Sequence, residues 1–366
     1  MINVLVPRRK RKIFDEYLAH WGLGVAPFMQ LHCYEDLPDA TVLPGGTWLF
    51  ADVDELKPAP LNLACTLRDL LMAAGMPVLN DPRAVLLRRP LLEVLHAEGV
   101  NRFRVFEARG DLSAALFPVF IRRASQHTGS LTPLLHDRVE LYRSLVRLRL
   151  AGEPVDDLLV VEFLDTSDGD GLFRKFGAFI VDGQVVARSL NRGTEWMVKH
   201  GTTGFDADFQ REELRYVEAN PHAAELGRIA RLARIDYGRI DYGLLNGAVQ
   251  TWEINMCPTI GRGARPSSGK VPDDIQELRA QVKQLFYTNF AKAWQRIDAP
   301  AVRELAVTFS PEQRRAARNA FALPHTPWRP WLRLVRTVLR PIKPALQTSL
   351  DRAVGMIVSR RSSREP

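Results

Sequence analysis

Short apolar runs alternate with amphipathic stretches in the first 80 residues. The runs INVLV (residues 2–6) and TWLFAD (residues 47–52) have the β-branched and aromatic content of buried strands. The stretch CTLRDLLMAAG (residues 65–75) instead repeats its apolar positions at the spacing of a helix. Strands that alternate with helices predict a small α/β domain, which we expect to end near residue 80.

The next stretch, residues 77–100, predicts a turn followed by a helix. It contains two prolines, and its later apolar positions recur near the helical period. Asp81 precedes Pro82, and proline is favoured at the first position of a helix, so we expect the helix to begin there.

Strand patterns dominate residues 103–190. Asp182-Gly183 separates two of these runs, which is a strong signal of a β-hairpin. Residues 134–152 interrupt the strands with an amphipathic pattern that predicts a helix. The mixture indicates an α/β (α+β) fold class. Further helices are predicted over residues 212–233 and 273–297.

The stretch GRIDYGLLNGAVQTWEIN (residues 238–255) predicts two strands around an Asn-Gly turn. It nevertheless carries Asp241, Glu253 and Asn255 where buried strands usually carry apolar side chains. Because alternate residues of a strand lie on one face, Glu253 and Asn255 share a face whatever the turn. The open question is whether Asp241 joins them.

The length of the loop decides the answer. A two-residue turn at Asn246-Gly247 would place Asp241 opposite Trp252, on the face away from Glu253. A three-residue loop over residues 245–247 would make Glu253 a diagonal neighbour of Asp241. We expect the three-residue loop, because it pairs residue 244 with residue 248 and gathers the apolar side chains on one face. The polar face would then carry Arg239, Asp241, Thr251, Glu253 and Asn255, and the apolar face Ile240, Tyr242, Leu244, Trp252 and Ile254.

Such a polar face would present two carboxylates and an amide oxygen. These are hard ligands that suit Mg²⁺, which takes few ligands from protein and the remainder from phosphates and water. Two neighbouring carboxylates also repel each other unless a cation holds them. The alternative interpretation is a polar face that is simply solvated.

The net charge of +8 suggests nucleic-acid binding only until it is mapped along the chain. From residue 311 onward there are 12 Lys/Arg against 3 Asp/Glu, and the preceding 310 residues hold 38 basic and 39 acidic groups. The basicity therefore belongs to the C-terminal stretch, and no nucleic-acid partner is expected for the rest. As an amphipathic basic helix, that stretch would suit a peripheral membrane surface or a partner protein. The alternative is a poorly ordered extension.

Cysteine usage and hydropathy bear on the compartment. The three cysteines are odd in number and widely spaced, which argues against a disulfide framework. The apolar run before Pro7 is too short for a signal peptide, and no uncharged apolar stretch approaches about 18 residues. We expect a soluble cytoplasmic protein.

Two stretches upstream of the hairpin carry further candidate chemistry. FPVFIRRASQHTGS (residues 117–130) predicts a strand that ends in Arg122 and Arg123, followed by a small polar loop that contains His127. Cations at a strand end beside such a loop suit a phosphate group. DLLVVEFLD (residues 157–165) predicts an apolar strand that ends at Glu162, Phe163 and Leu164.

The order and spacing of these parts resemble the ATP-grasp superfamily of carboxylate–amine ligases over residues 75–270. The specific match is RID…WEIN, which is similar to the family's final motif of an Asp on one strand and Glu-x-Asn on the next. The hairpin is most similar to glutathione-synthetase-like and ribosomal-protein glutamate-ligase-like members. The resemblance implies an ATP-grasp fold with three parts. These are an N-terminal α/β pre-ATP-grasp domain (residues 1–80), an ATP-grasp domain (81–300, hinge near 162–165) and a basic helical or partly disordered extension (301–366).

The resemblance also implies roles around ATP. Arg122 stands where the family has a phosphate-contacting Lys, although Arg123 is an alternative, and His127 lies in the loop over the phosphates. A basic residue on a following strand contacts phosphate as well, either Lys175 or Arg174. The remaining implied roles are contact with the adenine edge by Glu162, Phe163 and Leu164, and binding of Mg²⁺ or Mn²⁺ by Asp241, Glu253 and Asn255.

The implied reaction joins a small carboxylate to an amine, such as an amino acid or peptide. ATP would convert the carboxylate to an acyl phosphate, which the amine attacks to release phosphate, with ADP as the other product. Arg239 would hold the substrate carboxylate or the acyl phosphate, or else form an ion pair with Asp241 or Glu253. Arg188, Arg192 and Lys199 are candidate carboxylate ligands near the acceptor, or part of a solvated basic loop. Two other functions stay open, a non-catalytic ATP-binding regulator and an ATP-grasp phosphotransferase.

Overall fold

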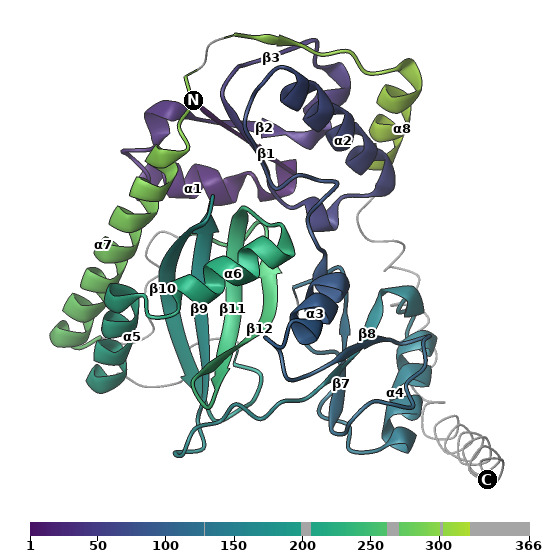
Figure 1. The fold of residues 1–366 in the computed structure, drawn as a ribbon, viewed down its shortest axis with the longest axis vertical. Helices are drawn as coiled ribbons and strands as arrows, with labels where there is room; N and C mark the ends of the chain where they lie inside the picture. The colour runs from purple at the N-terminus through teal and green to yellow at the C-terminus, as the bar shows by residue number, and fades with distance from the viewer. Residues whose placement is uncertain (128, 199–205, 262–270, 301–302, 323–366) are drawn as a thin grey trace. The chain divides into compact units, whose positions relative to one another are not determined.

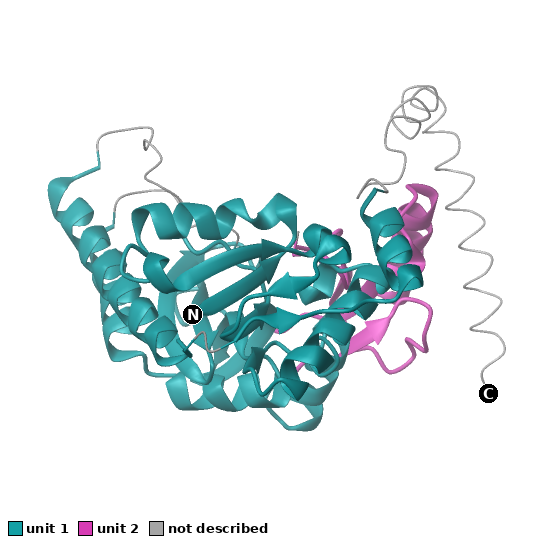
Figure 2. Ribbon diagram, turned by 90° about the horizontal axis from the view of Figure 1, so that it is seen from above, with its two compact units in different colours: residues 1–102, 165–322 teal, residues 103–164, 323–366 magenta. Residues whose placement is uncertain are grey.

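The computed structural model describes residues 1–127, 129–198, 206–261, 271–300 and 303–322. Contacts group the chain into two compact units (Figure 2). Unit 1 contains Met1–Arg102 and Asp165–Ala322, and the described part of unit 2 is Phe103–Leu164. The two units divide at other positions, so the domain boundaries near residues 80 and 300 stay predictions.

Unit 1 begins with a parallel sheet of order β2-β1-β4-β5. Its two central strands are buried along their whole length, which is typical of a parallel sheet covered on both faces. The strands predicted over residues 2–6 and 47–52 are confirmed, and the helix predicted over 65–75 is part of α2. The elements are β1 (Ile2–Val6), α1 (Lys12–His20), β2 (Met29–Cys33), β4 (Thr47–Phe50), α2 (Pro58–Ala73) and β5 (Val78–Leu79).

The chain returns to this first sheet after residue 302. β13 (Leu305–Ala306) pairs with β3 (Val42–Leu43), and α8 (Pro311–Ala322) packs against α2. Arg314 on α8 donates to the backbone carbonyl of Ala40, so this part of the basic stretch has an intramolecular use. The amphipathic helix predicted farther along, over residues 327–366, lies outside the described residues.

The second sheet of unit 1 is antiparallel, of order β10-β9-β11-β12 (Figure 1). The hairpin predicted at Asp182-Gly183 is confirmed, since both residues have positive φ and join β9 to β10. Alternation along β9 separates two faces: Phe176 contacts Tyr216 of α5, whereas Phe179 contacts Phe286 of α7. The elements are β9 (Phe173–Val181), β10 (Gln184–Gly193), α5 (Ala207–Ala219), α6 (Ala223–Ala233), β11 (Tyr237–Leu245), β12 (Ala248–Asn255) and α7 (Asp273–Arg296).

The helix predicted to begin at Asp81-Pro82 begins later, so that prediction is wrong. α3 spans Arg88–Ala97. Asp81 instead accepts a hydrogen bond from the backbone N–H of Arg83, at 2.9 Å, which closes a tight turn. The backbone N–H of Leu86 donates to the carbonyl of Ala233 at the end of α6. This long-range bond holds the segment before α3 outside a helix.

Unit 2 has its own small antiparallel sheet, of order β6-β8-β7. One helix, α4 (Arg138–Leu150), is capped by Asp137, whose carboxylate accepts the N–H of Glu140 at 2.8 Å. Val119, Ile121 and Val160 belong to a separate apolar core. The strands are β6 (Val105–Glu107), β7 (Val119–Arg123) and β8 (Leu158–Glu162). No helix in the described ranges of either unit is long and apolar enough to cross a membrane.

Candidate functional site

The hairpin of β11 and β12 turns through Asn246 and Gly247 alone. Their φ values are 50° and 81°, and Leu245 pairs directly with Ala248. Positive φ at both central residues is the signature of a type I′ turn, for which Asn-Gly is the preferred sequence. The prediction of a three-residue loop is therefore wrong, because Asn and Gly both tolerate the left-handed conformation and need no third residue.

A β-bulge farther along the hairpin changes the pairing. Tyr242 pairs with Thr251, but the next pair is Asp241 with Glu253, so Trp252 is the extra residue. The bulge therefore places Asp241 directly opposite Glu253 on one face. The expectation that Asp241 shares a face with Glu253 thus holds for a different structural reason. Thr251, which was expected on the polar face, pairs with Tyr242 instead.

The side chain of Asn101 occupies the outer edge of β12 at this bulge. Its Nδ2 donates to the carbonyl of Thr251 at 3.0 Å, and its Oδ1 accepts the N–H of Thr251 at 2.8 Å. An edge strand otherwise leaves such groups unpaired. One buried amide therefore satisfies the backbone next to Trp252 and holds the bulge in place.

Asp241 is the centre of a buried charge cluster. Its Oδ1 lies 2.6 Å from Nε of Arg239, and its Oδ2 lies 3.0 Å from Nη2 of Arg239 and 2.7 Å from Nζ of Lys175. Oε2 of Glu253 lies 2.8 Å from Nη2 of Arg88 on α3. We call these five residues the hairpin cluster. It contains three cations against two carboxylates.

Asp241 pairs with Gly177 on β9, which has no side chain. A Cβ at Gly177 would lie 3.0 Å from Oγ of Ser189 and 3.5 Å from Cδ of Arg239. A side chain at this position would therefore crowd the hydroxyl of Ser189, whereas its contact with Arg239 would be an ordinary van der Waals contact.

Alternation on β9 also distinguishes the two basic candidates there. Lys175 contacts Asp241, whereas Nε of Arg174 lies 2.7 Å from Oε1 of Glu212 on α5. The two side chains therefore point to opposite faces, and Lys175 is the one that belongs to the hairpin cluster.

The oxygen donors predicted for a metal are Asp241, Glu253 and Asn255. Oδ1 of Asn255 accepts the N–H of Cys257 at 2.9 Å, and both Asp241 oxygens are paired with cations. Among the described residues, no three His, Cys, Asp or Glu side chains gather closely enough to hold a metal ion. The predicted set contains two carboxylates and one amide, and its chemistry matches Mg²⁺, a cation that is bound through few protein oxygens.

The other predicted residues belong to unit 2. Arg122 lies on β7 opposite Leu159 and is largely buried, and His127 is half-buried in the loop that follows. Oε1 of Glu162 lies 2.7 Å from Nη2 of Arg104, and it also accepts the N–H of Leu116 at 2.8 Å. The Glu162 side chain is thus engaged within unit 2.

β8 ends at Glu162, and Phe163 and Leu164 follow directly. The N–H of Phe163 donates to the carbonyl of Pro118 at 2.9 Å. Leu164 is the last residue of unit 2 in this stretch.

Comparison with known proteins gives structural matches alone. No protein-family model matches the chain, and no curated protein matches it. D-alanine–D-alanine ligase from Bacillus anthracis, complexed with ATP, is 12% identical with a TM-score of 0.42, over 81% of this chain and 99% of the other. The ATP-grasp ligase PsnB with its minimal precursor is 13% identical with a TM-score of 0.46, over 80% and 98%.

A RimK domain ATP-grasp protein from Sphaerobacter thermophilus is 14% identical with a TM-score of 0.42, over 78% and 98%. All three TM-scores are below 0.5. The functional interpretation below therefore depends on the chain's own residues.

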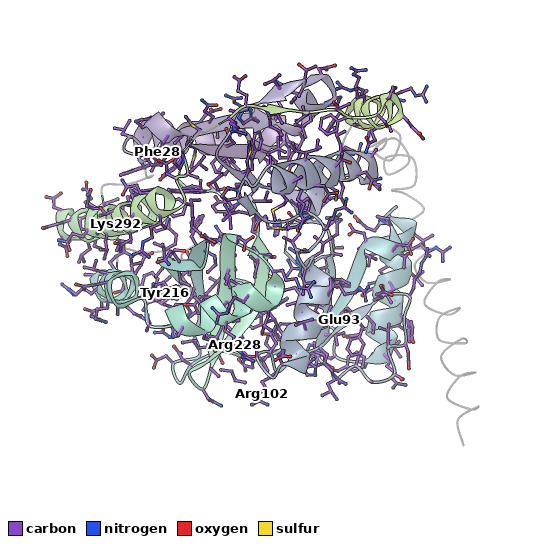
Figure 3. The ribbon with its side chains drawn as sticks, turned by 45° about the horizontal axis from the view of Figure 1, so that its top comes forward. Phe28, Glu93, Arg102, Tyr216, Arg228 and Lys292 are labelled. Carbon is purple, nitrogen blue, oxygen red and sulfur yellow. The ribbon has the colours of Figure 1, made fainter. Side chains whose placement is uncertain are left out.

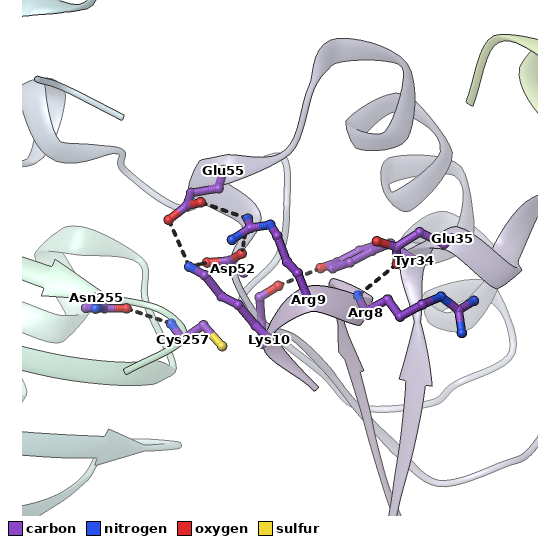
Figure 4. Close-up of polar contacts among 10 residues, drawn as sticks. Arg8, Arg9, Lys10, Tyr34, Glu35, Asp52, Glu55, Asn255 and Cys257 are labelled. Carbon is purple, nitrogen blue, oxygen red and sulfur yellow. Dashed lines mark hydrogen bonds and ion pairs between the residues drawn. The ribbon is translucent and has the colours of Figure 1, made fainter. Parts of the chain in front are cut away.

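A second charge cluster, which the sequence pattern did not reveal, lies where β1 and β4 end (Figure 4). Nη2 of Arg9 lies 2.9 Å from Oδ2 of Asp52 and 2.7 Å from Oε2 of Glu55, and Nζ of Lys10 contacts the same two carboxylates. Burial raises the pKa of Asp52 to about 7, although Lys10 opposes the shift. The available signal was the polar sequence that follows each of two adjacent parallel strands, where ligands commonly bind.

This second cluster adjoins the end of the hairpin. The N–H of Asp52 points to the carbonyl of Met256, at 3.4 Å, directly after Asn255. Cys257 follows and is a free, buried thiol, and burial raises its pKa well above the ordinary range. The thiolate form is therefore disfavoured, which indicates a small packing residue rather than a nucleophile.

Proposed function

We propose that the chain is an ATP-dependent carboxylate–amine ligase of the ATP-grasp type, which forms ADP and an amide through an acyl phosphate. One observation carries the proposal. The bulge at Trp252 places Asp241 directly opposite Glu253, with Lys175 and Arg239 in contact with Asp241. Arg239, Asp241, Trp252 and Glu253 belong to the RID…WEIN motif, which resembles the final motif of the superfamily.

The charge balance of the hairpin cluster suits a polyphosphate. Three cations face two carboxylates, so the arrangement has positive charge to offer an anion. Phosphate oxygens would compete with Asp241 for Lys175 and Arg239, and a guanidinium can grip phosphate with two parallel hydrogen bonds. Mg²⁺ or Mn²⁺ bound by Asp241, Glu253 and Asn255 would neutralise charge on the transferring phosphoryl group.

In unit 2 we assign phosphate contacts to Arg122 and His127, and the adenine contact to residues 162–164. The Glu162 carboxylate is engaged by Arg104, and the Phe163 N–H is engaged by Pro118. We therefore assign the adenine contact to the carbonyl of Phe163 and the backbone of Leu164 rather than to the Glu162 side chain.

The substrates we propose are a small carboxylate and an amine, one of them an amino acid or peptide. A regulator that only binds ATP has no need of two carboxylates paired across one bulge. A phosphotransferase would use the same clamp but would leave the phosphoryl group on a hydroxyl.

The test is ADP release from ATP and Mg²⁺ in the presence of amino acids, supplied singly and in pairs. We expect stimulated release for the wild type, and at least about a hundredfold loss for Asp241→Asn and Glu253→Gln, since metal-held phosphate charge is a large catalytic contribution. Asp208→Asn is the control, because that side chain is 94% exposed on α5.

The products separate the alternatives. Amide formation supports the ligase. ATP binding without any stimulated turnover, together with unchanged Mg·ATP affinity in Asp241→Asn, would indicate the regulator. A phosphorylated hydroxyl compound would indicate the phosphotransferase.

A further inference from the structure

A cavity of about 260 Å³ lies within unit 1, lined by residues of β10, α5 and α7. Its volume is near the lower end for small-molecule sites, so it suits a ligand about the size of one amino acid or a dipeptide. The lining contains both signs of charge. The charged lining residues are Arg188, Asp206, Glu213, Arg279 and Lys283.

Two of the three cations of the cavity are held by neighbouring side chains. The guanidinium of Arg188 lies 4.5 Å above the ring of Phe286 on α7, and burial lowers its pKa. Nε of Arg279 donates to Oε1 of Gln210 at 2.9 Å. Lys283 has no hydrogen bond or ion pair within the described ranges of the chain. The cavity is thus lined by one cation from β10 and two from α7.

Glu213 provides a negative group in the same cavity. Its Oε1 accepts the N–H of Leu190 on β10, at 3.3 Å, which orients the carboxylate. Burial raises the pKa of Glu213, although the hydrogen bond from Leu190 and the charges of Arg188 and Arg279 oppose this shift. Asp206 differs, because its side chain caps α5 and pairs with Arg192. Glu213 is therefore the carboxylate better placed to receive a ligand's ammonium group.

The cavity adjoins the hairpin cluster through β10. Arg188 interacts electrostatically with Arg239. The next residue, Ser189, pairs with Gly177, which in turn pairs with Asp241. The strand that carries Arg188, and would hold the ligand, is thus adjacent to the strand that carries Lys175.

We propose that this cavity binds an amino-acid zwitterion, with the carboxylate at Arg188, Arg279 and Lys283 and the ammonium at Glu213. The assignment of that amino acid as a ligase substrate rests on the proposed function, whereas its binding does not. The lining carries both signs of charge, so a zwitterion offers a partner to each sign, whereas a simple anion or a simple amine offers a partner to one sign alone.

Calorimetry on the full chain tests the binding. The twenty amino acids are titrated singly, with and without Mg²⁺ and a non-hydrolysable ATP analogue. We expect at least one to bind, and its N-acetyl and amide derivatives to bind at least about tenfold more weakly, equal to about 1.4 kcal/mol. No binding in either condition, or equal binding of the N-acetyl derivative, would overturn the proposal.

Matched variants locate the site. Glu213→Gln and Lys283→Met should each weaken binding at least about tenfold, since each removes one partner of a charge pair. Glu218→Gln on α5 and Lys292→Met on α7 (Figure 3) are exposed, lie outside the cavity and should bind as the wild type does. Equal weakening in both sets would refute the assignment to this cavity, provided thermal melting shows that all four variants are folded.

The two proposals fail in different ways. Amino-acid binding that depends on Glu213, without any ATP turnover, would retain the cavity and reject the ligase. Turnover stimulated by amino acids and unchanged in Glu213→Gln, with unchanged affinity, would retain the ligase and reject the cavity.

Discussion

At the scale of single residues, Asp52 has the environment with the clearest solution consequence. Its side chain is fully buried and contacts both Arg9 and Lys10, yet burial raises its pKa from 3.8 to about 7. Desolvation of the charged form is the largest cause, the charges of Glu55 and Asp54 add to it, and Lys10 does not fully offset it.

The sign of the resulting pH effect follows from proton counting. Between about pH 4 and pH 7 the folded chain keeps a proton on Asp52 that the unfolded chain has lost. Retention of this proton on Asp52 therefore contributes to the free energy of unfolding. The contribution is fully present below about pH 4 and is lost as the pH rises through about 7. We expect the free energy of unfolding, measured with urea, to decline between about pH 4 and pH 7. The Asp52→Asn variant should lack this part of the pH dependence.

Asp208→Asn, on an exposed side chain, should keep the wild-type pH profile. An Asp52→Asn profile parallel to the wild type throughout this range would contradict the assigned origin of the effect.

At the scale of elements, the turn at Asn246-Gly247 depends on backbone conformation alone. Gly247 has φ of 81°, and a Cβ built there meets no heavy atom within 4 Å. We expect Gly247→Ala to lower the free energy of unfolding by about 1 kcal/mol, because a left-handed φ is unfavourable for alanine.

Gly24 gives a matched comparison. A Cβ there also meets nothing within 4 Å, but its φ is not in the left-handed region. Gly24→Ala should therefore be neutral or slightly stabilising in the same denaturation experiment. Equal losses in the two variants would show that conformational strain is not the cause.

The elements show what local sequence can predict. The strand at residues 2–6 and the hairpin at Asp182-Gly183 were predicted because apolar content and turn chemistry are local signals. The bulge at Trp252 was not, because the side chain that holds it, Asn101, is 150 residues away from Thr251. The start of α3 was missed for a similar reason, since Leu86 bonds to Ala233.

The candidate site divides in the same way. The residue types of the hairpin were sufficient to single out Asp241 and Glu253. Their cation partners were harder to find, because Arg88 comes from a helix whose start was misplaced. The amino-acid cavity joins residues of β10, α5 and α7, and only tertiary structure brings Glu213 near Arg188.

At the scale of the whole chain, unit 1 has one continuous apolar core. The core joins residues of both its sheets and includes Phe309 and Ala317, which follow α7. Ala317 is fully buried on α8, whereas its neighbour Ala316 is exposed. The two alanines therefore test whether the end of the described chain supports the fold at its beginning.

We expect Ala317→Asp to destabilise unit 1 by about 3 kcal/mol or more, because it buries a charge without a partner. Hydrogen exchange should show lower protection in β1 and β4, and in the second sheet if the core unfolds as a unit. Ala316→Asp should leave protection unchanged. A loss confined to α8 in Ala317→Asp would contradict cooperative coupling through the core.

The bulge at Trp252 also divides β12 into two parts with separate side-chain alternation. Between the turn and Thr251, the face on which a side chain lies is counted from Asn246-Gly247, whereas from Glu253 onward it is counted from the bulge. A loop that is longer or shorter by two residues would keep the side chains of both parts on their present faces. Removal of Trp252 alone would leave the turn intact and make the ladder regular, with Thr251 still opposite Tyr242 and Glu253 still opposite Asp241. The pairing of Asp241 with Glu253 therefore depends on Trp252 staying outside the ladder, separately from the loop that closes the hairpin.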